Sequence, residues 1–326
     1  MGMLINGVWH DKDVGIRDQG AFKRAAAHFR NWVTPDGSAG PAGRDGFAAE
    51  SGRYHLYVSY ACPWAHRTLI VRKLKGLEDH ISVSVVHYFM GENGWDFHDR
   101  EGATVDHLQG SDFLWQVYAA ADPSYNGRVT VPVLWDKKQE TIASNESSEI
   151  IRMFNNAFNG LDSVDADLDL CPLALQSEID AINDPIYNNI NNGVYKCGFA
   201  STQEAYEEAF DALFSTLDMV EERLSGQRYL MGDTITEADW RLFPTLLRFD
   251  PVYVGHFKCN RQRIADFPAL SGYLRELYQW PGVAETVSMD HIKKHYYMSH
   301  GSINPTRIVP KGPLIDLTLP HGREAL

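Results

Sequence analysis

A cysteine at the start of a predicted helix is the residue of this sequence best placed to do chemistry. Cys62 follows an alternating aromatic and aliphatic run at residues 54–60, which predicts a strand, and precedes a helical pattern at residues 63–74. Pro63 is favoured at the first helical position, so Cys62 is the expected N-cap. A thiol there faces unpaired N–H groups and the positive end of the helix dipole. Such sites lower a cysteine pKa from about 8.5 to about 3.5–7.5. The position predicts a sulfur nucleophile; the alternative is a buried packing residue.

The remaining cysteines indicate where a second thiol would come from. Cys171, Cys197 and Cys259 are widely spaced, with no C-x-x-C pair and no zinc-type rhythm, so neither a disulfide framework nor a metal site is expected. Ala65 stands where a dithiol redox helix would carry its second cysteine. Cys62 therefore has no local resolving partner, and its chemistry favours an external, low-molecular-weight thiol.

Length and charge limit the protein class. With 326 residues, of which 44% are hydrophobic, the chain favours two domains. A formal net charge of −13 argues against nucleic acid or an anionic membrane as partner. The sequence has no apolar run of the ~18 residues that a membrane span needs and no signal-peptide core at its start. A cytoplasmic protein is expected.

The elements that must position Cys62 form a βαβ pattern. The strand at 54–60, the helix at 63–74 and a second strand at 81–87 predict two parallel strands joined by a right-handed crossover. Residues 1–50 are expected to be an N-terminal extension, with an amphipathic helix at 21–32.

The middle of the chain is less regular. Residues 88–127 form a long insertion rich in Gly, Asp and aromatic residues. The next strand, at 128–136, contains Pro132, so the strand lies at an edge there or the Val131–Pro132 bond is cis. Either case leaves backbone groups of Val131 available to a ligand. A short strand is expected at 140–143.

Helices dominate the second half. Polar capping residues at 144–149 precede a predicted helix at 150–158. Further helices are expected at 204–224, 236–249 and 268–278, the second opened by a capping box of Thr236 and Asp239 whose role is taken as structural. The chain from 295 lacks periodicity and is expected to form a strap.

This layout resembles the glutathione transferases: an α/β plus all-α protein, with a thioredoxin-like domain followed by a helical domain. More narrowly, the block Cys62-Pro63-Trp64-Ala65-His66-Arg67 resembles the glutathionyl-hydroquinone reductases, the Xi class, and the runs at 192–199, 253–258 and 304–305 match the same group. The predicted segments are an N-terminal extension (1–50), a thioredoxin-like glutathione-binding domain (51–165) with its insertion (88–127), a helical domain (166–290) and a C-terminal tail (291–326).

The resemblance implies glutathione-dependent reduction of glutathionyl-hydroquinones, through a mixed disulfide between Cys62 and glutathione that a second glutathione resolves. It implies glutathione as co-substrate and a homodimer. The positions that match the glutathione site are Trp95, Arg128, Val131, Glu146 and Ser147. Those that match the aromatic-substrate site are Tyr195, Tyr253 and Tyr296, with Tyr195 and Tyr296 as catalytic candidates beside Cys62 and Tyr297 as a further candidate.

The chemistry of the glutathione-site residues fits these roles. Glu146 can pair with the γ-glutamyl ammonium, and Ser147 with the helix N–H groups can bind the adjacent carboxylate. Val131 can exchange backbone hydrogen bonds with the cysteinyl part. Arg128 and the indole N–H of Trp95 could hold the glycine end. The alternatives are ordinary helix capping for the first pair, a solvated charge for Arg128 and a loop anchor for Trp95.

Tyrosine hydroxyls can donate a proton to a developing phenolate and their rings can stack on an aromatic substrate, although most of the 15 tyrosines must be structural. His66, one turn after Cys62, is expected to pack.

Two other functions stay open. One is a general thioltransferase or dehydroascorbate reductase, and the other is a non-catalytic binding protein of the same fold.

Overall fold

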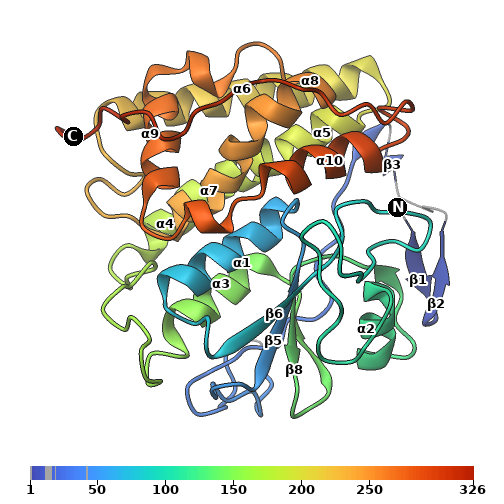
Figure 1. The fold of residues 1–326 in the computed structure, drawn as a ribbon. Helices are drawn as coiled ribbons and strands as arrows, with labels where there is room; N and C mark the ends of the chain where they lie inside the picture. Colours follow the sequence, from blue (N-terminus) through green and yellow to red (C-terminus); the bar gives the residue numbers. More distant parts are fainter. Residues whose placement is uncertain (1, 12–16, 19, 42) are drawn as a thin grey trace. The chain divides into compact units, whose positions relative to one another are not determined.

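The structure is a computed structural model that describes residues 2–11, 17–18, 20–41 and 43–326 (Figure 1). These residues form two compact units. The first lies within Met1–Gly15, Ala26–Leu168 and Thr286–Ser299, and the second within Ile16–Ala25, Asp169–Glu285 and His300–Leu326. The division into four segments made from the sequence stays a prediction.

A four-stranded sheet forms the centre of the first unit, in the order β6-β5-β8-β9. The central strand β5 pairs in parallel with β6 and antiparallel with β8, which pairs antiparallel with β9. All five residues of β5 are buried. The parallel pairing of β5 with β6 confirms the predicted βαβ unit. The strands of this sheet are β5 (Tyr54–Val58), β6 (Ile81–Val85), β8 (Val133–Asp136) and β9 (Thr141–Ser144). Two helices, α1 (Pro63–Leu74) and α3 (Ser147–Asn156), lie side by side next to it (Figure 1).

The strand predicted at 128–136 is interrupted by a cis peptide bond between Val131 and Pro132. Proline lacks the N–H that a ladder needs, so β8 begins only after it. The residues before it pair elsewhere: Arg128 lies opposite Met3 in a small antiparallel sheet. That sheet consists of β1 (Met3–Ile5), β2 (Val8–His10) and β7 (Gly127–Arg128).

The helix predicted at 21–32 is wrong. The structure has β4 (Ala21–Phe22), paired with β3 (Arg17–Asp18), and no helix in the described residues that follow up to 32. The backbone there bonds to the first unit's sheet region: the N–H of Asn31 donates to the carbonyl of Ala143 (2.9 Å). Tertiary hydrogen bonds thus override a weak helical periodicity.

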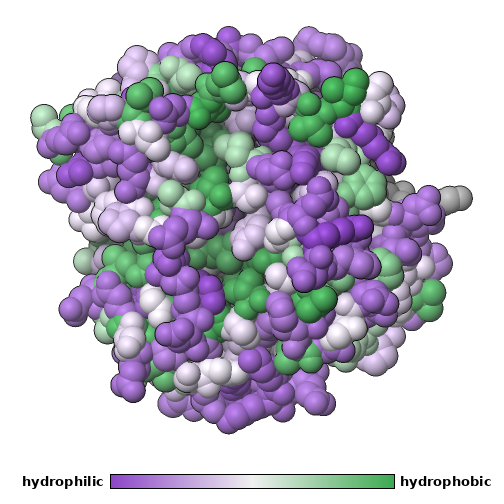
Figure 2. All heavy atoms as spheres, in the orientation of Figure 1, coloured by the Kyte–Doolittle hydropathy of each residue, from purple (hydrophilic) through white to green (hydrophobic). Residues whose placement is uncertain are grey.

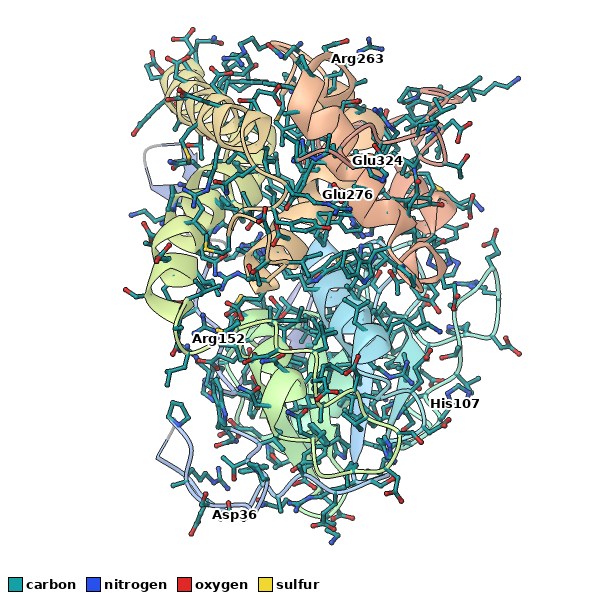
Figure 3. All side chains as sticks on the ribbon, turned by 90° about the vertical axis from the view of Figure 1, so that its left-hand side faces the viewer. Asp36, His107, Arg152, Arg263, Glu276 and Glu324 are labelled. Atoms are coloured by element: carbon teal, nitrogen blue, oxygen red, sulfur yellow. The ribbon has the colours of Figure 1, made fainter. Side chains whose placement is uncertain are left out.

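Two other regions contain more helix than the sequence predicted. The insertion 88–127 contains α2 (Leu114–Ala121), and the chain after 288 forms α10 (Met289–Ser299). Only residues 300–326 lack helix and strand at the C-terminal end. This part is anchored by Arg323, which donates to the Glu276 carboxylate (3.3 Å) and to the carbonyl of Leu224 (3.0 Å). Glu276, which is labelled in Figure 3, lies on α9 (Pro268–Gln279).

The second unit is helical, as predicted, and its long helices begin and end within about two residues of the expected positions. The capping box that opens α7 is confirmed: Asp239 accepts from the N–H of Thr236 (2.8 Å) and from the hydroxyl of Tyr273 (2.7 Å). The remaining helices and turns of the chain are α4 (Gln176–Pro185), η1 (Ile186–Asn191), α5 (Gly193–Phe199), α6 (Gln203–Ser225), α7 (Glu237–Arg248), η2 (Phe249–Tyr253), α8 (Val254–His256), η3 (Ile264–Asp266), α9 (Pro268–Gln279) and η4 (Ala284–Thr286).

Hydrophilic residues make up most of the face drawn in Figure 2, with smaller hydrophobic areas between them. Within the described part of the chain, no helix combines the length and the apolar character that crossing a membrane requires.

Candidate functional site

Cys62 occupies the predicted N-cap of α1, with Pro63 in the first turn. Its backbone is still extended (φ −78°, ψ 121°), and its N–H donates to the carbonyl of Ser59 (3.1 Å). The thiol is half-buried, and its Sγ lies 3.5 Å from the carbonyl oxygen of Val131. The nucleophile candidate therefore lies beside the cis peptide bond, at the positive end of a helix.

Val131 offers backbone groups next to this thiol. The residue is 5% exposed, and its N–H has no hydrogen-bond acceptor among the described residues. The neighbouring N–H of Thr130 donates to the hydroxyl of Tyr118 (3.3 Å). A buried backbone donor normally has a partner, so an extended ligand that pairs here as an added strand fits this position.

Glu146 and Ser147 open α3. The Glu146 carboxylate accepts from the N–H of Ser148 (3.1 Å) and from its hydroxyl (2.8 Å), which is the capping geometry. Ser147 is 3% exposed, and its hydroxyl lies 3.5 Å from Nη1 of Arg67. A carboxylate, a hydroxyl and a helix N-terminus together suit a ligand that carries both an ammonium and a carboxylate.

Arg67 is the neighbour of this site that the sequence reasoning left without a role. It is 1% exposed, and its guanidinium lies 4.5 Å from the ring centroid of Trp64. The sequence signal that could have indicated Arg67 is its position five residues after Cys62, in the helix that Cys62 caps. The positive charge of the Arg67 guanidinium, next to Ser147, adds to the positive potential at the start of α3.

Trp95 and Arg128 both belong to the first unit. Trp95 is buried in the insertion and stacks on His295 of α10, with 4.8 Å between ring centroids. Arg128 is half-buried on β7, and its carbonyl accepts from the hydroxyl of Tyr125 (3.0 Å). Stacking on His295 fits the anchoring role that is the alternative for Trp95.

Tyr296 and Tyr297 lie on α10, which is held to the insertion by Glu101, whose carboxylate lies 3.5 Å from Nζ of Lys294 on α10. The Glu101 carboxylate accepts from the hydroxyl of Tyr88 (2.7 Å) and lies 3.2 Å from Nε2 of His87. These hydrogen bonds lower the pKa of Glu101 to about 2. Tyr296 is 1% exposed, and burial raises the pKa of Tyr297, which makes Tyr297 a weaker acid.

Tyr195 and Tyr253 come together in the second unit, with 6.1 Å between their ring centroids. Tyr195 is half-buried on α5, whereas Tyr253 is fully buried at the end of η2. Phe257 stacks on Tyr253 (5.5 Å, 9° between planes) and also contacts Tyr195 (5.5 Å). The predicted pair of tyrosines is thus embedded in an aromatic cluster.

His66 has the expected packing role. It is 1% exposed, and its Nε2 lies 2.8 Å from the hydroxyl of Thr286. A thiolate at a helix N-terminus needs no such base. The described residues contain no group of three or more His, Cys, Asp or Glu side chains that could hold a metal ion.

Two family models match the chain: the N-terminal domain of glutathione S-transferase over residues 61–157 and its C-terminal domain over residues 203–276. The Xi-class glutathione transferase of Natrialba magadii superposes with a TM-score of 0.91 at 50% identity, covering 100% of this chain and 97% of that one. This chain belongs to the Xi class of the glutathione transferases.

Two glutathionyl-hydroquinone reductases are similar to this chain over at least 96% of their length. The glutathionyl-hydroquinone reductase YqjG of Escherichia coli is 59% identical over 99% of each chain, and its glutathione-bound structure superposes with a TM-score of 0.92. The glutathionyl-hydroquinone reductase PcpF of Sphingobium chlorophenolicum is 52% identical over 96% of each chain. The match confirms the thioredoxin-like and helical domains expected of this Xi-class transferase.

Proposed function

We propose that this Xi-class transferase is a glutathionyl-hydroquinone reductase that uses glutathione as co-substrate. The observation that carries the proposal is the half-buried Cys62 thiol at the start of α1, 3.5 Å from the carbonyl of Val131. A conjugating transferase activates the thiol of bound glutathione with a hydroxyl donor and needs no protein thiol. A cysteine in that place forms a disulfide with glutathione and turns conjugation into thiol transfer. The names of two close relatives, YqjG and PcpF, support the same activity.

The reaction balances in two steps. In the first step, the Cys62 thiolate attacks the sulfur of the glutathionyl-hydroquinone, the bond from sulfur to the ring carbon breaks, and that carbon takes the electron pair and a proton. The products are hydroquinone and a mixed disulfide of Cys62 with glutathione. In the second step, the thiolate of another glutathione attacks the mixed disulfide at the glutathione sulfur. Oxidised glutathione leaves and the Cys62 thiolate is regenerated.

The glutathione portion is proposed to bind along the first unit. The backbone of Val131 pairs with the cysteinyl part, while Glu146 and Ser147 hold the γ-glutamyl ammonium and carboxylate. Arg128 and Trp95 hold the glycine end. The free N–H of Val131 among the described residues and the helix N-terminus at Ser147 support these assignments.

The aromatic portion is proposed to be bound by Tyr195, Tyr253 and Tyr296. Tyr195 and Tyr296 supply hydroxyl protons as the ring carbon and phenolic oxygens take up charge. Tyr253, which is fully buried, serves as a wall. The homodimer and the cytoplasmic location that the sequence predicts are part of the same proposal, and molecular mass in solution checks the first.

A panel of substrates tests the function. Purified protein with excess glutathione should release one oxidised glutathione for each hydroquinone formed from glutathionyl-hydroquinones. Small disulfides and dehydroascorbate should turn over more slowly. Faster turnover of either one would favour the thioltransferase or dehydroascorbate reductase alternative, and absence of turnover with all of them would favour a non-catalytic binding protein.

Glu146→Gln should raise the KM for glutathione about ten- to hundredfold, because it removes a charge-assisted hydrogen bond to the ammonium. The kcat at saturating glutathione should change much less. Initial rates against glutathione concentration measure both. The matched control is Glu221→Gln, since Glu221 also caps a helix, accepting from the N–H groups of Ala269 and Leu270 (both 2.7 Å). An equal KM increase in both variants would contradict the ligand role of Glu146.

A further inference from the structure

A short segment near the N-terminus is fixed to both ends of α5 within the second unit. At the C-terminal end of α5, the carbonyl of Gly20 accepts from the N–H of Ser201 (3.0 Å). The ring of Phe22 packs on Phe199, the last residue of α5, with 5.6 Å between centroids. Gly20 has φ +86°, and a Cβ there would lie 2.6 Å from Thr202, the N-cap residue of α6, so the backbone of the segment passes close to the link between α5 and α6.

Arg24 lies two residues farther on and contacts the N-terminal end of α5. Its Nε donates to Oδ1 of Asn192 (2.7 Å), and its guanidinium carbon lies 5.0 Å from the centroid of the Tyr195 ring. Asn192 is 6% exposed and is the N-cap residue of α5. Because positions three apart face the same side of a helix, Asn192 and Tyr195 present one surface to Arg24.

The geometry points to Arg24 as a positioning residue for Tyr195: the N-terminal segment carries a guanidinium onto the ring of the proposed proton donor and holds it there. This inference rests on the proposed function of Tyr195. Asn192 orients the guanidinium, so the cation is directed by a residue of the same helix that carries the tyrosine.

A cation over a phenol ring has two effects on proton donation. It fixes the ring by attraction to the electron-rich face. It also stabilises the negative charge that appears on the phenolic oxygen when the hydroxyl gives its proton to the aromatic product, since opposite charges attract. Both effects are stronger when the oxygen becomes negative, so they should act on kcat more than on the KM for glutathione.

The experiment compares Arg24→Met with Arg24→Lys, using turnover of a glutathionyl-hydroquinone with saturating glutathione. Arg24→Met should lower kcat about three- to fivefold without changing the KM for glutathione, and Arg24→Lys should restore part of the loss. The alkaline limb of the pH profile of kcat should move to higher pH in Arg24→Met, because the tyrosine becomes a weaker acid and keeps its proton longer.

Arg44→Met is the matched control. The guanidinium carbon of Arg44 lies 5.6 Å from the ring centroid of Phe47, so this variant also removes an exposed arginine from an aromatic ring. It should keep the wild-type kcat and pH profile. A wild-type kcat in Arg24→Met, or an equal loss in Arg44→Met, would overturn the inference.

A double-variant comparison shows whether Arg24 acts through Tyr195. In a Tyr195→Phe background, Arg24→Met should cause no further loss of kcat. A loss of the same size there would show direct action on the substrate and refute the positioning role. If Tyr195→Phe alone keeps full turnover, the proton-donor role of Tyr195 fails together with this inference, while glutathionyl-hydroquinone reduction stands. If the wild-type protein turns over no glutathionyl-hydroquinone, the proposed function itself fails.

Discussion

Cys62→Ser should abolish the reduction of glutathionyl-hydroquinones, lowering kcat about a thousandfold or more. Serine is close to cysteine in size and is a favoured N-cap residue, but at neutral pH its hydroxyl is neither ionised nor able to form a disulfide. Both proposed steps need the sulfur, since the first forms the mixed disulfide and the second breaks it. Release of hydroquinone and of oxidised glutathione should therefore disappear together.

Mass spectrometry gives an independent measurement of the same prediction. Exposure of the wild-type protein to oxidised glutathione should add one glutathione to the peptide that contains Cys62, and Cys62→Ser should remove that adduct. The matched control is Cys171→Ser, because Cys171 is also half-buried. It should keep both turnover and the adduct. Labelling mainly at Cys171, Cys197 or Cys259 would contradict the assignment of Cys62 as nucleophile.

Local signals in the sequence predicted the elements that carry the nucleophile. Cys62 as N-cap follows from Pro63 and the change of hydrophobic period, both of which are contained in about ten residues. The capping box at Thr236 is equally local, and α7 opens where it predicts. The cis bond before Pro132 was one of two outcomes that a proline in a strand allows.

Features that depend on contacts distant in sequence were missed. Residues 21–32 have a helical period, yet their backbone bonds to residues more than a hundred positions away, such as Ala143. The end of the chain was expected to form a strap from 295, but α10 continues to Ser299, with His295 stacked on Trp95. Arg67 and Arg24 gained their interest only when the structure placed them beside Ser147 and Tyr195. No local pattern encodes such partners.

The buried ion pair of Arg53 and Asp136 holds together the two strands that lead to the site. Asp136 is fully buried and accepts from Nε (2.9 Å) and Nη2 (2.5 Å) of Arg53, whose side chain is 5% exposed. The carboxylate raises the pKa of Arg53, which keeps the guanidinium charged. In the register of β5 and β8, Asp136 lies opposite Tyr54, and the same pairing continues to Tyr57 and Val133. Cys62 follows one of these strands and the cis peptide precedes the other.

Asp136→Ala should therefore lower the free energy of unfolding of the first unit by about 3 kcal/mol, because it removes the two buried hydrogen bonds to the guanidinium and leaves Glu50, whose side chain is 39% exposed, as the remaining carboxylate partner of Arg53 (2.9 Å). Chemical denaturation followed by circular dichroism measures the loss. The matched control is Asp218→Ala, which breaks an exposed pair with Arg261 and should cost less than about 1 kcal/mol.

A double replacement separates the buried charge from the strand contact. Arg53→Met with Asp136→Leu removes both charges and keeps apolar volume, so it should recover most of the stability that Asp136→Ala loses. At temperatures where Asp136→Ala is still folded, its kcat should stay close to that of the wild-type protein, because the ion pair holds strands and touches no reacting atom. A large fall in kcat of the folded variant would instead show that the pairing of β5 with β8 adjusts the distance between Cys62 and Val131.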